Sequence, residues 1–465
     1  MTTSVGPLRC ERVNATMTQL PLVLRAGTPG SVRTRADRIG DQLVMTFAID
    51  GSMNQGALSP QDGESIAFAA FTALEKRIPL IGFVESSGAD ILAGIGAAHG
   101  WGTAARALVR CSGVVPVIIV VTGPAVSGPA LFLGLADAVI MVEHSYAFVS
   151  GPQMVRQFTG EELTNNELGG PAMHARTSGV ASLIAADAAE ANMLVAELLR
   201  YLPPHADVEP TTVASNDPIS RLTPELLDII PESATGSYDV RDIVRSIVDD
   251  GEMLELKASW ATNLVTAFAS IDGRPVGIVA NQPQSLAGTL DISASQKGGR
   301  FVALCDAFNL PLLTLVDTSG FYPGKDLEWR GMIRYGAQMA FAYARATVPR
   351  VMVTLRKSYG GAYIVMDSKN MGNDLALAWP TAEIAVMGAK GAVEILYRRA
   401  TAEERLALER SYEERLLNPY IASERGSIDA IIDPTDTRRL VGACFEILSS
   451  KRERLPKRRH DNSPL

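Results

Sequence analysis

RKSYGGAYI, residues 356–364, decides the fold of this chain. The stretch follows an apolar run that ends at Leu355, and an earlier segment matches it: Val115-Pro116 leads an apolar run into Ala125-Val126-Ser127-Gly128-Pro129. The two segments align without gaps at an offset of 233 residues, which places Ser127-Gly128 on Gly360-Gly361. The pattern predicts a buried strand, a glycine turn and a helix, present twice in the chain.

A second pair of matching segments supports a duplication. Residues 78–80 and 87–89 (IPL and SGA) match residues 310–312 and 319–321 (LPL and SGF) at an offset of 232 residues. Two independent matches with nearly equal offsets are hard to obtain by chance, and the spacing is far longer than any solenoid repeat. We therefore expect one copy of the same domain in each half.

Composition and charge narrow the class of protein. The chain has 465 residues, of which 47% are hydrophobic and only 6% aromatic, with 40 glycines, as is typical of a close-packed α/β enzyme. The net charge of −8 gives the chain as a whole no electrostatic reason to bind nucleic acid. The one compact basic run, Lys451 to His460, is interpreted as a solvated or interface-bound terminus.

The cysteines and the apolar segments indicate a reduced, cytoplasmic protein without metal or membrane span. The four cysteines are scattered without metal-ligand spacing, and the first residues show no signal-peptide pattern. The longest apolar region, Val114 to Val142, is interrupted by prolines, glycines and Asp137. A buried strand followed by a helix is therefore favoured over a transmembrane helix.

Strand and helix patterns alternate in the same order in both halves, which predicts parallel β units with helical crossovers. In the first half we expect strands at 43–49, 80–85 and 117–121, and a helix at 64–75. In the second half we expect strands at 276–280, 312–317 and 351–355, and helices at 297–308 and 331–346. The proline-rich region 203–247 is predicted to be an extended connection. The predicted division is an irregular arm at 1–40, an N-terminal domain at 41–250 and a C-terminal domain at 251–465.

A Gly-Gly-Ala turn between a buried strand and a helix can present consecutive backbone N–H groups to a developing negative charge. Small residues are needed there because a larger side chain would keep a substrate oxygen away from the backbone. Glycines at such junctions can also serve close packing alone, and for a single turn that interpretation would lead. The sequence contains no GxSxG, HExxH or P-loop motif and only five histidines, so chemistry carried by backbone donors is the simplest hypothesis.

From Phe47 onward the chain resembles the carboxyltransferase (β) subunits of biotin-dependent acyl-CoA carboxylases, of the propionyl-CoA carboxylase type. The resemblance rests on IDGRPVGIVANQP (271–283), FYPG (321–324) and WPTAEIAVMGAKGAVE (379–394), and extends to the ending KRRHDNSPL (457–465). It implies two crotonase-like domains per chain and a hexamer built as a trimer of dimers. The active site would lie between the N-terminal domain of one subunit and the C-terminal domain of another.

The resemblance also implies roles for the two turns. The acyl-CoA would sit on the N half, with its enolate oxygen at Ser127 and Gly128, and Gly88 and Ala89 would contact the substrate. Biotin would enter from the C half, to an oxyanion hole at Gly361 and Ala362 with Gly360, Gly320 and Phe321 beside it. The chain has no biotinylation motif and no ATP-binding half, so biotin would arrive on a biotin carboxylase or carrier partner.

The chain departs from the family pattern at four positions. Ser127 and Pro129 stand where members usually have Gly and Ala, and Pro129 has no N–H to donate. Asp90 stands where the family tends to place Arg. Ile364, beside Tyr363 in the expected acyl pocket, replaces a usual Asp, which predicts a preference for butyryl-CoA or longer or branched acyl groups. Core packing of Ile364 is the alternative.

Three other functions remain open from the sequence. The same two holes could stabilise the enolate formed when a malonyl-type CoA loses carbon dioxide. A non-catalytic subunit that acts only in assembly would fit the changes at Ser127, Pro129 and Asp90, although the intact Gly360-Gly361-Ala362 turn speaks against it. Nicotinamide-cofactor binding is disfavoured because no GxGxxG follows a strand with an acidic residue about 20 positions on.

Overall fold

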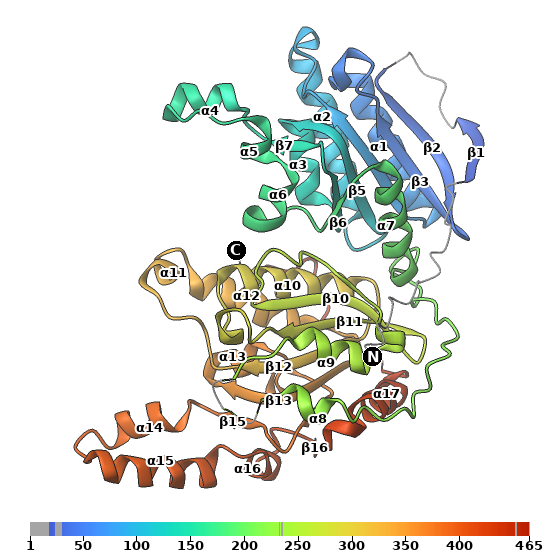
Figure 1. Ribbon diagram of the computed structural model, residues 1–465. Coiled ribbons are helices and arrows are strands. Elements are labelled where there is room, and N and C mark those ends of the chain that lie inside the picture. The colour runs from blue at the N-terminus through green and yellow to red at the C-terminus, as the bar shows by residue number, and fades with distance from the viewer. Residues whose placement is uncertain (1–17, 24–29, 232, 234–235, 452, 465) are drawn as a thin grey trace, which may run out of the picture.

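Two β-sheets, each covered by helices, form the two halves of the protein, with the N-terminal half above the C-terminal half in Figure 1. The computed structural model describes residues 18–23, 30–231, 233, 236–451 and 453–464. The predicted α/β fold, with one parallel-sheet domain in each half, is confirmed. No helix of the described residues is both long and apolar enough to cross a membrane.

Within the described residues, the N-terminal sheet has eight strands in the order β1-β2-β3-β4-β5-β6-β8, with β7 paired to β5. Its central pairs, β3 with β4, β4 with β5 and β5 with β6, are parallel, and only the β1–β2 and β2–β3 pairs are antiparallel. The strands are β1 (Thr18–Val23), β2 (Val32–Ile39), β3 (Gln42–Ile49), β4 (Leu80–Ser86), β5 (Val117–Val126), β6 (Ala138–Val142), β7 (Tyr146–Phe148) and β8 (Leu183–Ala185).

The C-terminal sheet repeats this order. It runs β9-β10-β11-β12-β13-β14-β16, with β15 paired to β13 in the place that β7 takes on β5. The registers correspond as well, because Leu80 pairs with Val117 in the first sheet and Leu312 pairs with Arg350 in the second. The strands are β9 (Met253–Glu255), β10 (Leu264–Ile271), β11 (Arg274–Asn281), β12 (Leu312–Thr318), β13 (Arg350–Tyr359), β14 (Leu375–Ala378), β15 (Glu383–Ala385) and β16 (Ala430–Ile431).

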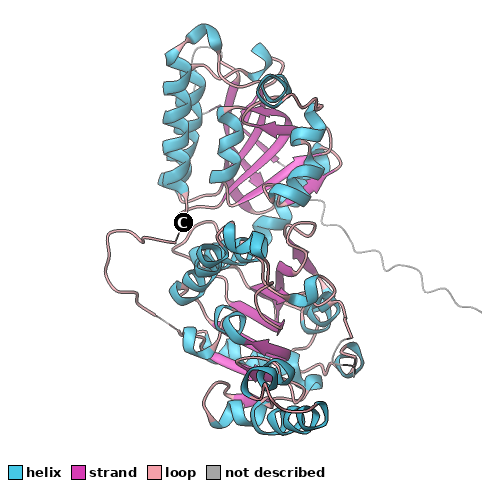
Figure 2. Ribbon diagram, turned by 90° about the vertical axis from the view of Figure 1, so that its left-hand side faces the viewer, coloured by secondary structure: helices cyan, strands magenta, loops and turns pink. Residues whose placement is uncertain are grey.

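Helices follow the strands and cover the faces of both sheets (Figure 2). Those of the N half are α1 (Pro60–Lys76), α2 (Ile95–Cys111), α3 (Gly128–Leu135), α4 (Pro152–Thr159), α5 (Asn165–Gly169), α6 (Pro171–Met173) and α7 (Ala188–Tyr201). Those of the C half are α10 (Ile292–Ala307), α11 (Lys325–Trp329), α12 (Met332–Arg345), α13 (Gly360–Val365), α14 (Ala389–Leu396), α15 (Ala402–Leu416), α16 (Pro419–Glu424) and α17 (Thr437–Leu448). Helices α14 and α15 project from the C half as a hairpin (Figure 1).

The arm predicted to be irregular contains two strands, β1 and β2, so that expectation was wrong for the described part of residues 1–40. Strand β2 forms an antiparallel hairpin with β3 through a turn at Gly40, whose φ is 58°. Both of its faces are partly buried, with Thr34 on one face and Asp37 on the other, and the Asp37 carboxylate accepts a hydrogen bond from the Thr46 hydroxyl at 3.0 Å. Because buried and polar positions occur on both faces, the sequence does not show the alternation of a strand with one buried face.

The proline-rich connection also differs from the prediction, because it contains α8 (Leu226–Ile229) and α9 (Val240–Ile247). Helix α9 buries four apolar side chains in the core under the C-terminal sheet, together with Leu226 and Tyr238. The boundary at residue 250 stays a prediction, but the residues from Leu226 onward already pack with the second core.

The two halves are joined by a shared apolar core. One cluster of buried side chains contains Leu198 and Tyr201 of α7 together with Phe268 of β10 and Phe301 of α10. The rings of Tyr201 and Phe268 stack with centroids 5.7 Å apart. Lys257 adds a polar contact across the halves, because its ammonium donates to the carbonyl oxygen of Gly179.

Candidate active site

The N-half turn connects β5 to α3. Ser127 caps α3 with φ 62° and ψ −121°, a conformation that residues other than glycine rarely adopt. Its N–H donates to the carbonyl oxygen of Phe148 at 2.9 Å and is therefore not available to a substrate. The next N–H, that of Gly128, donates to no side chain or loop carbonyl within the described part of the chain, and Pro129 has none.

A second backbone donor faces this turn from the loop after β4. The Leu58 N–H donates to the Gly88 carbonyl oxygen at 2.8 Å, and the Asp90 N–H donates to the Leu58 carbonyl oxygen at 3.0 Å. Because N–H groups alternate in direction along extended chain, the Ala89 N–H points away from Leu58, toward β5. Gly88 lies against the turn, since a Cβ built on it would be 3.5 Å from the Ser127 Cβ.

The C-half turn has the same construction. The Leu290 N–H donates to the Gly320 carbonyl oxygen at 3.1 Å, and the Tyr322 N–H donates to the Leu290 carbonyl oxygen at 2.9 Å. The Phe321 N–H therefore points toward the turn between β13 and α13. Gly360 has a φ of 59°, close to the 62° of Ser127, and Gly361 is exposed. The sequence match at the two turns is thus confirmed as a structural repeat.

Both turns leave little room beside the backbone. A Cβ built on Gly128 would lie 2.5 Å from the Trp101 ring, and one built on Gly361 would lie 3.2 Å from the Phe321 ring. Ala362, the next residue of the C-half turn, is fully buried, backbone included, whereas Gly361 is exposed. Neither the Gly361 nor the Ala362 N–H has an acceptor outside α13 among the described residues, and first-turn N–H groups have none within a helix.

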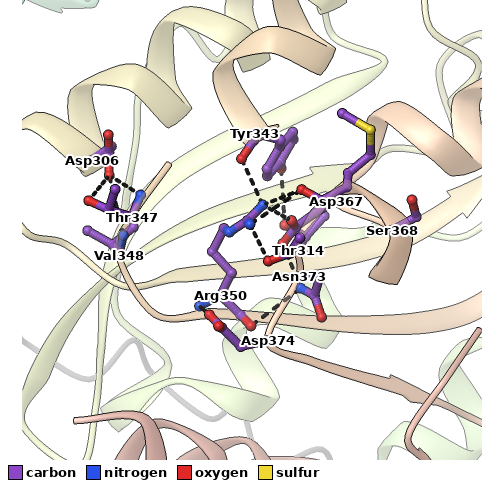
Figure 3. Close-up of polar contacts among 12 residues, drawn as sticks. Asp306, Thr314, Tyr343, Thr347, Val348, Arg350, Asp367, Ser368, Asn373 and Asp374 are labelled. Atoms are coloured by element: carbon purple, nitrogen blue, oxygen red, sulfur yellow. Dashed lines mark hydrogen bonds and ion pairs between the residues drawn. The ribbon is translucent and has the colours of Figure 1, made fainter. Parts of the chain in front are cut away.

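A buried ion pair joins the start of β13 to the segment that follows α13 (Figure 3). Arg350, at the start of β13, and Asp367, which follows α13, are 1% and 0% exposed, and Nη1 of Arg350 lies 2.7 Å from Oδ1 of Asp367. The same guanidinium donates to the carbonyl oxygens of Tyr343, at 2.8 Å, and of Gly372. Burial raises the pKa of Asp367 to about 6, although Arg350 opposes the shift. We call this ion pair the Arg350–Asp367 brace. The N half has Val117 at the position equivalent to Arg350, so it cannot form the same ion pair.

Ile364 is on the last turn of α13 and remains 36% exposed. Ile364 is therefore not fully enclosed by the core of this chain, although a single exposed apolar side chain is common on protein surfaces. Tyr363 is half-buried, and burial raises the pKa of its hydroxyl.

A cavity of about 290 Å³ adjoins the N-half turn. It is lined by Gly51, Gln55, Glu85, Ser87, Pro124, Val126 and Tyr146. Ser87 and Val126 are the residues that precede Gly88 and Ser127, so the cavity opens beside the two candidate donors. The described residues contain no group of three or more His, Cys, Asp or Glu side chains placed to hold a metal ion.

The structure thus brings the candidate residues into two separate groups. Gly88 and Ala89 lie with Ser127 and Gly128 in the N half, and Gly320 and Phe321 lie with the Gly360 turn, Ile364 and Tyr363 in the C half. One expectation needs correction, because the Ser127 N–H is occupied by Phe148. The Arg350–Asp367 brace was missed, since nothing in the sequence shows that two charged residues 17 positions apart meet in the core.

Comparison with known proteins places the chain in a family. The profile of the carboxyl transferase domain matches residues 15–463. The propionyl-CoA carboxylase beta chain of Saccharopolyspora erythraea is 43% identical over 443 residues, covering 91% of this chain and 81% of the relative. The methylmalonyl-CoA carboxyltransferase 12S subunit of Propionibacterium freudenreichii subsp. shermanii is 44% identical, over 84% of this chain and 76% of the relative.

Solved structures agree. The hexameric transcarboxylase 12S crystal structure, with methylmalonyl-CoA and methylmalonic acid bound, has a TM-score of 0.92 and 41% identity, covering 94% of this chain and 85% of that chain. A single-chain, multi-domain long-chain acyl-CoA carboxylase has a TM-score of 0.76 and 28% identity, over 89% of this chain and 41% of that chain.

The fold and the paired turns therefore define an enzyme of carboxyl transfer with two crotonase-like domains. The chain belongs to the carboxyl transferase family, as the resemblance in its sequence predicted.

Proposed function

We propose that this chain is the carboxyltransferase subunit of a biotin-dependent acyl-CoA carboxylase. It would move a carboxyl group from carboxybiotin, carried by a partner protein, to the α-carbon of an acyl-CoA. The observation that carries the proposal is the repeated turn, because among the described residues the N half presents two backbone N–H groups without a loop acceptor (Gly128 and Ala89) and the C half presents three (Gly361, Ala362 and Phe321). The names of the relatives, propionyl-CoA carboxylase and methylmalonyl-CoA carboxyltransferase, support the same reaction class.

The N-half turn is proposed to hold the acyl thioester. Loss of the α-proton places negative charge on the thioester oxygen, and the N–H groups of Gly128 and Ala89 would donate to it, because the loop at Gly88 lies against the Ser127 turn. Donors fixed by the fold need no reorganisation during the reaction, and losing one costs on the order of 3 kcal/mol of barrier. This assignment replaces the Ser127 N–H with the Ala89 N–H and keeps Gly128.

The C-half turn is proposed to receive biotin. The residues fit such a group, because Gly361 is exposed and has no side chain in the space beside the Phe321 ring. When bound, biotin supplies an activated carboxyl group on its ureido nitrogen and leaves with the α-proton of the acyl-CoA in exchange. The Gly361 and Ala362 N–H groups, with that of Phe321, would stabilise negative charge on the ureido oxygen. Gly320 and Gly360 provide the turns that aim these donors.

We further propose butyryl-CoA, or a longer or branched acyl-CoA, as the preferred substrate. The half-exposed Ile364 offers an apolar contact where a carboxylate would have to be desolvated. Each additional buried CH₂ group contributes about 0.8 kcal/mol, or about fourfold in binding. Tyr363 precedes it and would line the same pocket.

The assembly is proposed to be a hexamer, with the site formed between the N half of one subunit and the C half of another. The two groups of candidate residues lie in different halves of one chain (Figure 1), so a second copy is needed to bring them together. The hexameric transcarboxylase 12S structure supports this assembly. A biotin carboxylase and a biotinylated carrier would complete the system, and the free thiols of the described part of the chain, at Cys111, Cys305 and Cys444, suit a cytoplasmic location.

Fixation of radioactive bicarbonate tests the proposal. The chain would be combined with ATP, a biotin carboxylase and a biotinylated carrier, and assayed with acetyl-, propionyl-, butyryl- and hexanoyl-CoA. We expect kcat/KM to rise from acetyl-CoA to butyryl-CoA, and Ile364→Asp to move the maximum toward propionyl-CoA. Equal or better turnover of acetyl-CoA would contradict the chain-length proposal. Release of carbon dioxide from methylmalonyl-CoA without any carboxylation would favour the decarboxylase alternative.

A further inference from the structure

Ser127 occupies a backbone conformation in which a side chain is unfavourable. Its φ of 62° and ψ of −121° correspond to the first central residue of a type II′ turn, a position that glycine normally fills. The other copy of the fold has glycine there, because Gly360 has a φ of 59°. A glycine at this position would relieve the strain, yet the residue is a serine. Strained residues concentrate at functional sites.

The backbone groups of Ser127 form hydrogen bonds within the protein, but its hydroxyl does not. Its N–H donates to the Phe148 carbonyl oxygen at 2.9 Å, and its carbonyl oxygen accepts from the Ala130 N–H at 3.2 Å. The backbone is thus used inside the protein. The residue is exposed, and within the described chain the hydroxyl has no hydrogen-bond partner. The hydroxyl is the one polar group of Ser127 left to meet a ligand.

The position of the side chain matches that use. The Ser127 Cβ lies 3.5 Å from a Cβ built on Gly88, so the hydroxyl starts between the Gly88–Ala89 loop and the Gly128 turn. The 290 Å³ cavity lined by Ser87 and Val126 opens next to it and provides room for part of a substrate. This turn also has fewer N–H donors than its copy, because the residue after Gly128 is a proline whereas Ala362 follows Gly361.

We infer that Ser127 is a catalytic residue through its hydroxyl, which donates a hydrogen bond to the thioester oxygen of the acyl-CoA as that oxygen gains enolate charge. The hydroxyl replaces the backbone N–H that Pro129 cannot provide at this turn. The inference rests on the proposed function, since it assumes an acyl-CoA bound at the N-half turn. It also explains why the strained serine is present where the C half has glycine.

Two substitutions separate the hydroxyl from the backbone strain. Ser127→Ala removes the hydroxyl and keeps a side chain at positive φ, whereas Ser127→Gly removes both. We expect both variants to lower kcat for acyl-CoA carboxylation about 100-fold. We expect only Ser127→Gly to raise the melting temperature, by about 2 °C. Because glycine suits this conformation, the second variant will fold.

Arg77→Gly is the matched control. Arg77 also has a positive φ, 56°, but it ends α1 just before the start of β4, at the opposite edge of the sheet from the turn. It should change stability without changing kcat. A further readout is the release of carbon dioxide from carboxybiotin without acyl-CoA, which depends on the C half and should stay at the wild-type rate in Ser127→Ala.

The outcomes separate this inference from the proposed function. A wild-type enzyme that carboxylates butyryl-CoA, with Ser127→Ala equally active, would overturn the role of the hydroxyl and leave the proposed function intact. Equal loss of both activities in Ser127→Ala would also overturn it, because that result indicates a structural role. A wild-type protein inactive on every acyl-CoA, with an active biotin partner, would refute the proposed function itself.

Discussion

Arg350→Met should destabilise the protein strongly, because the substitution leaves a carboxylate unpaired in the core. Methionine fills much of the same space, so the main change is the loss of charge and donors (Figure 3). Asp367, fully buried, would keep only the Asn373 amide at 2.8 Å as a partner. The carbonyl oxygen of Gly372 would lose its donor as well, whereas that of Tyr343 would keep the Ala346 N–H at 3.1 Å.

The expected size follows from these contacts. Removing one partner of a buried ion pair costs about 3–5 kcal/mol, and the orphaned carbonyl oxygen adds to that figure. The control is Arg345→Met, because Arg345 pairs with Asp461 at 2.7 Å but is 45% exposed. Such a partly exposed pair contributes about 0–1 kcal/mol. The two variants remove the same side chain type, from positions five residues apart.

Urea unfolding at fixed protein concentration measures both variants. The destabilisation by Arg350→Met should be larger at pH 8 than at pH 5.5. The pKa of Asp367 is raised in the fold to about 6 from 3.8, so the contribution of this carboxyl to stability is present below pH 3.8 and lost as pH rises through 6. Without Arg350 its pKa rises further, and protonation relieves the variant at low pH. Equal urea midpoints for Arg350→Met and Arg345→Met would show that the Arg350–Asp367 brace does not stabilise the fold.

Two other predictions concern the contact between the halves and its surroundings. Burial raises the pKa of Asp137 to about 6, so the wild-type protein should lose stability as the pH rises from 4 to 7. Asp137→Asn should remove this pH dependence, because its side-chain oxygen can still accept from the Val117 N–H. A thermal melt series over that range that is unchanged by the substitution would contradict this. Gly179→Ala should destabilise by about 1–3 kcal/mol, because φ is 66° and a Cβ would lie 2.3 Å from the Trp260 ring. A urea midpoint at the wild-type value would show that Trp260 moves freely.

The architecture could be predicted from the sequence because both copies repeat the same signals. Val115-Pro116 and Val348-Pro349 precede matching apolar runs, and each run became a central parallel strand, β5 and β13. The elements least visible in the sequence were β2, which buries Thr34 on one face and Asp37 on the other, and α9, which follows a proline-rich segment. Tertiary contacts stabilise both elements, and local periodicity does not report such contacts.

The candidate site was predictable as a set of turns but not as a set of donors. Gly88 and Gly320 stand at matching positions of the two copies, and the resemblance to the family assigned each of them to its turn. Which N–H is free depends on the partner strand, and the pairing of the Ser127 N–H with Phe148 on β7 is a contact between distant segments. The direction of the Ala89 N–H likewise follows from its bridge to Leu58.

The central claim is that the N-half turn binds the acyl-CoA and the C-half turn receives biotin. The binding of butyryl-CoA to two glycine variants tests this claim most directly. Isothermal titration would compare Gly128→Ala, whose Cβ would lie 2.5 Å from the Trp101 ring, with Gly361→Val, which crowds Phe321. We predict that Gly128→Ala binds butyryl-CoA at least tenfold more weakly, a loss of about 1.4 kcal/mol. We predict that Gly361→Val binds it with the wild-type Kd but transfers no carboxyl group. Weaker acyl-CoA binding by Gly361→Val with wild-type binding by Gly128→Ala would contradict the account.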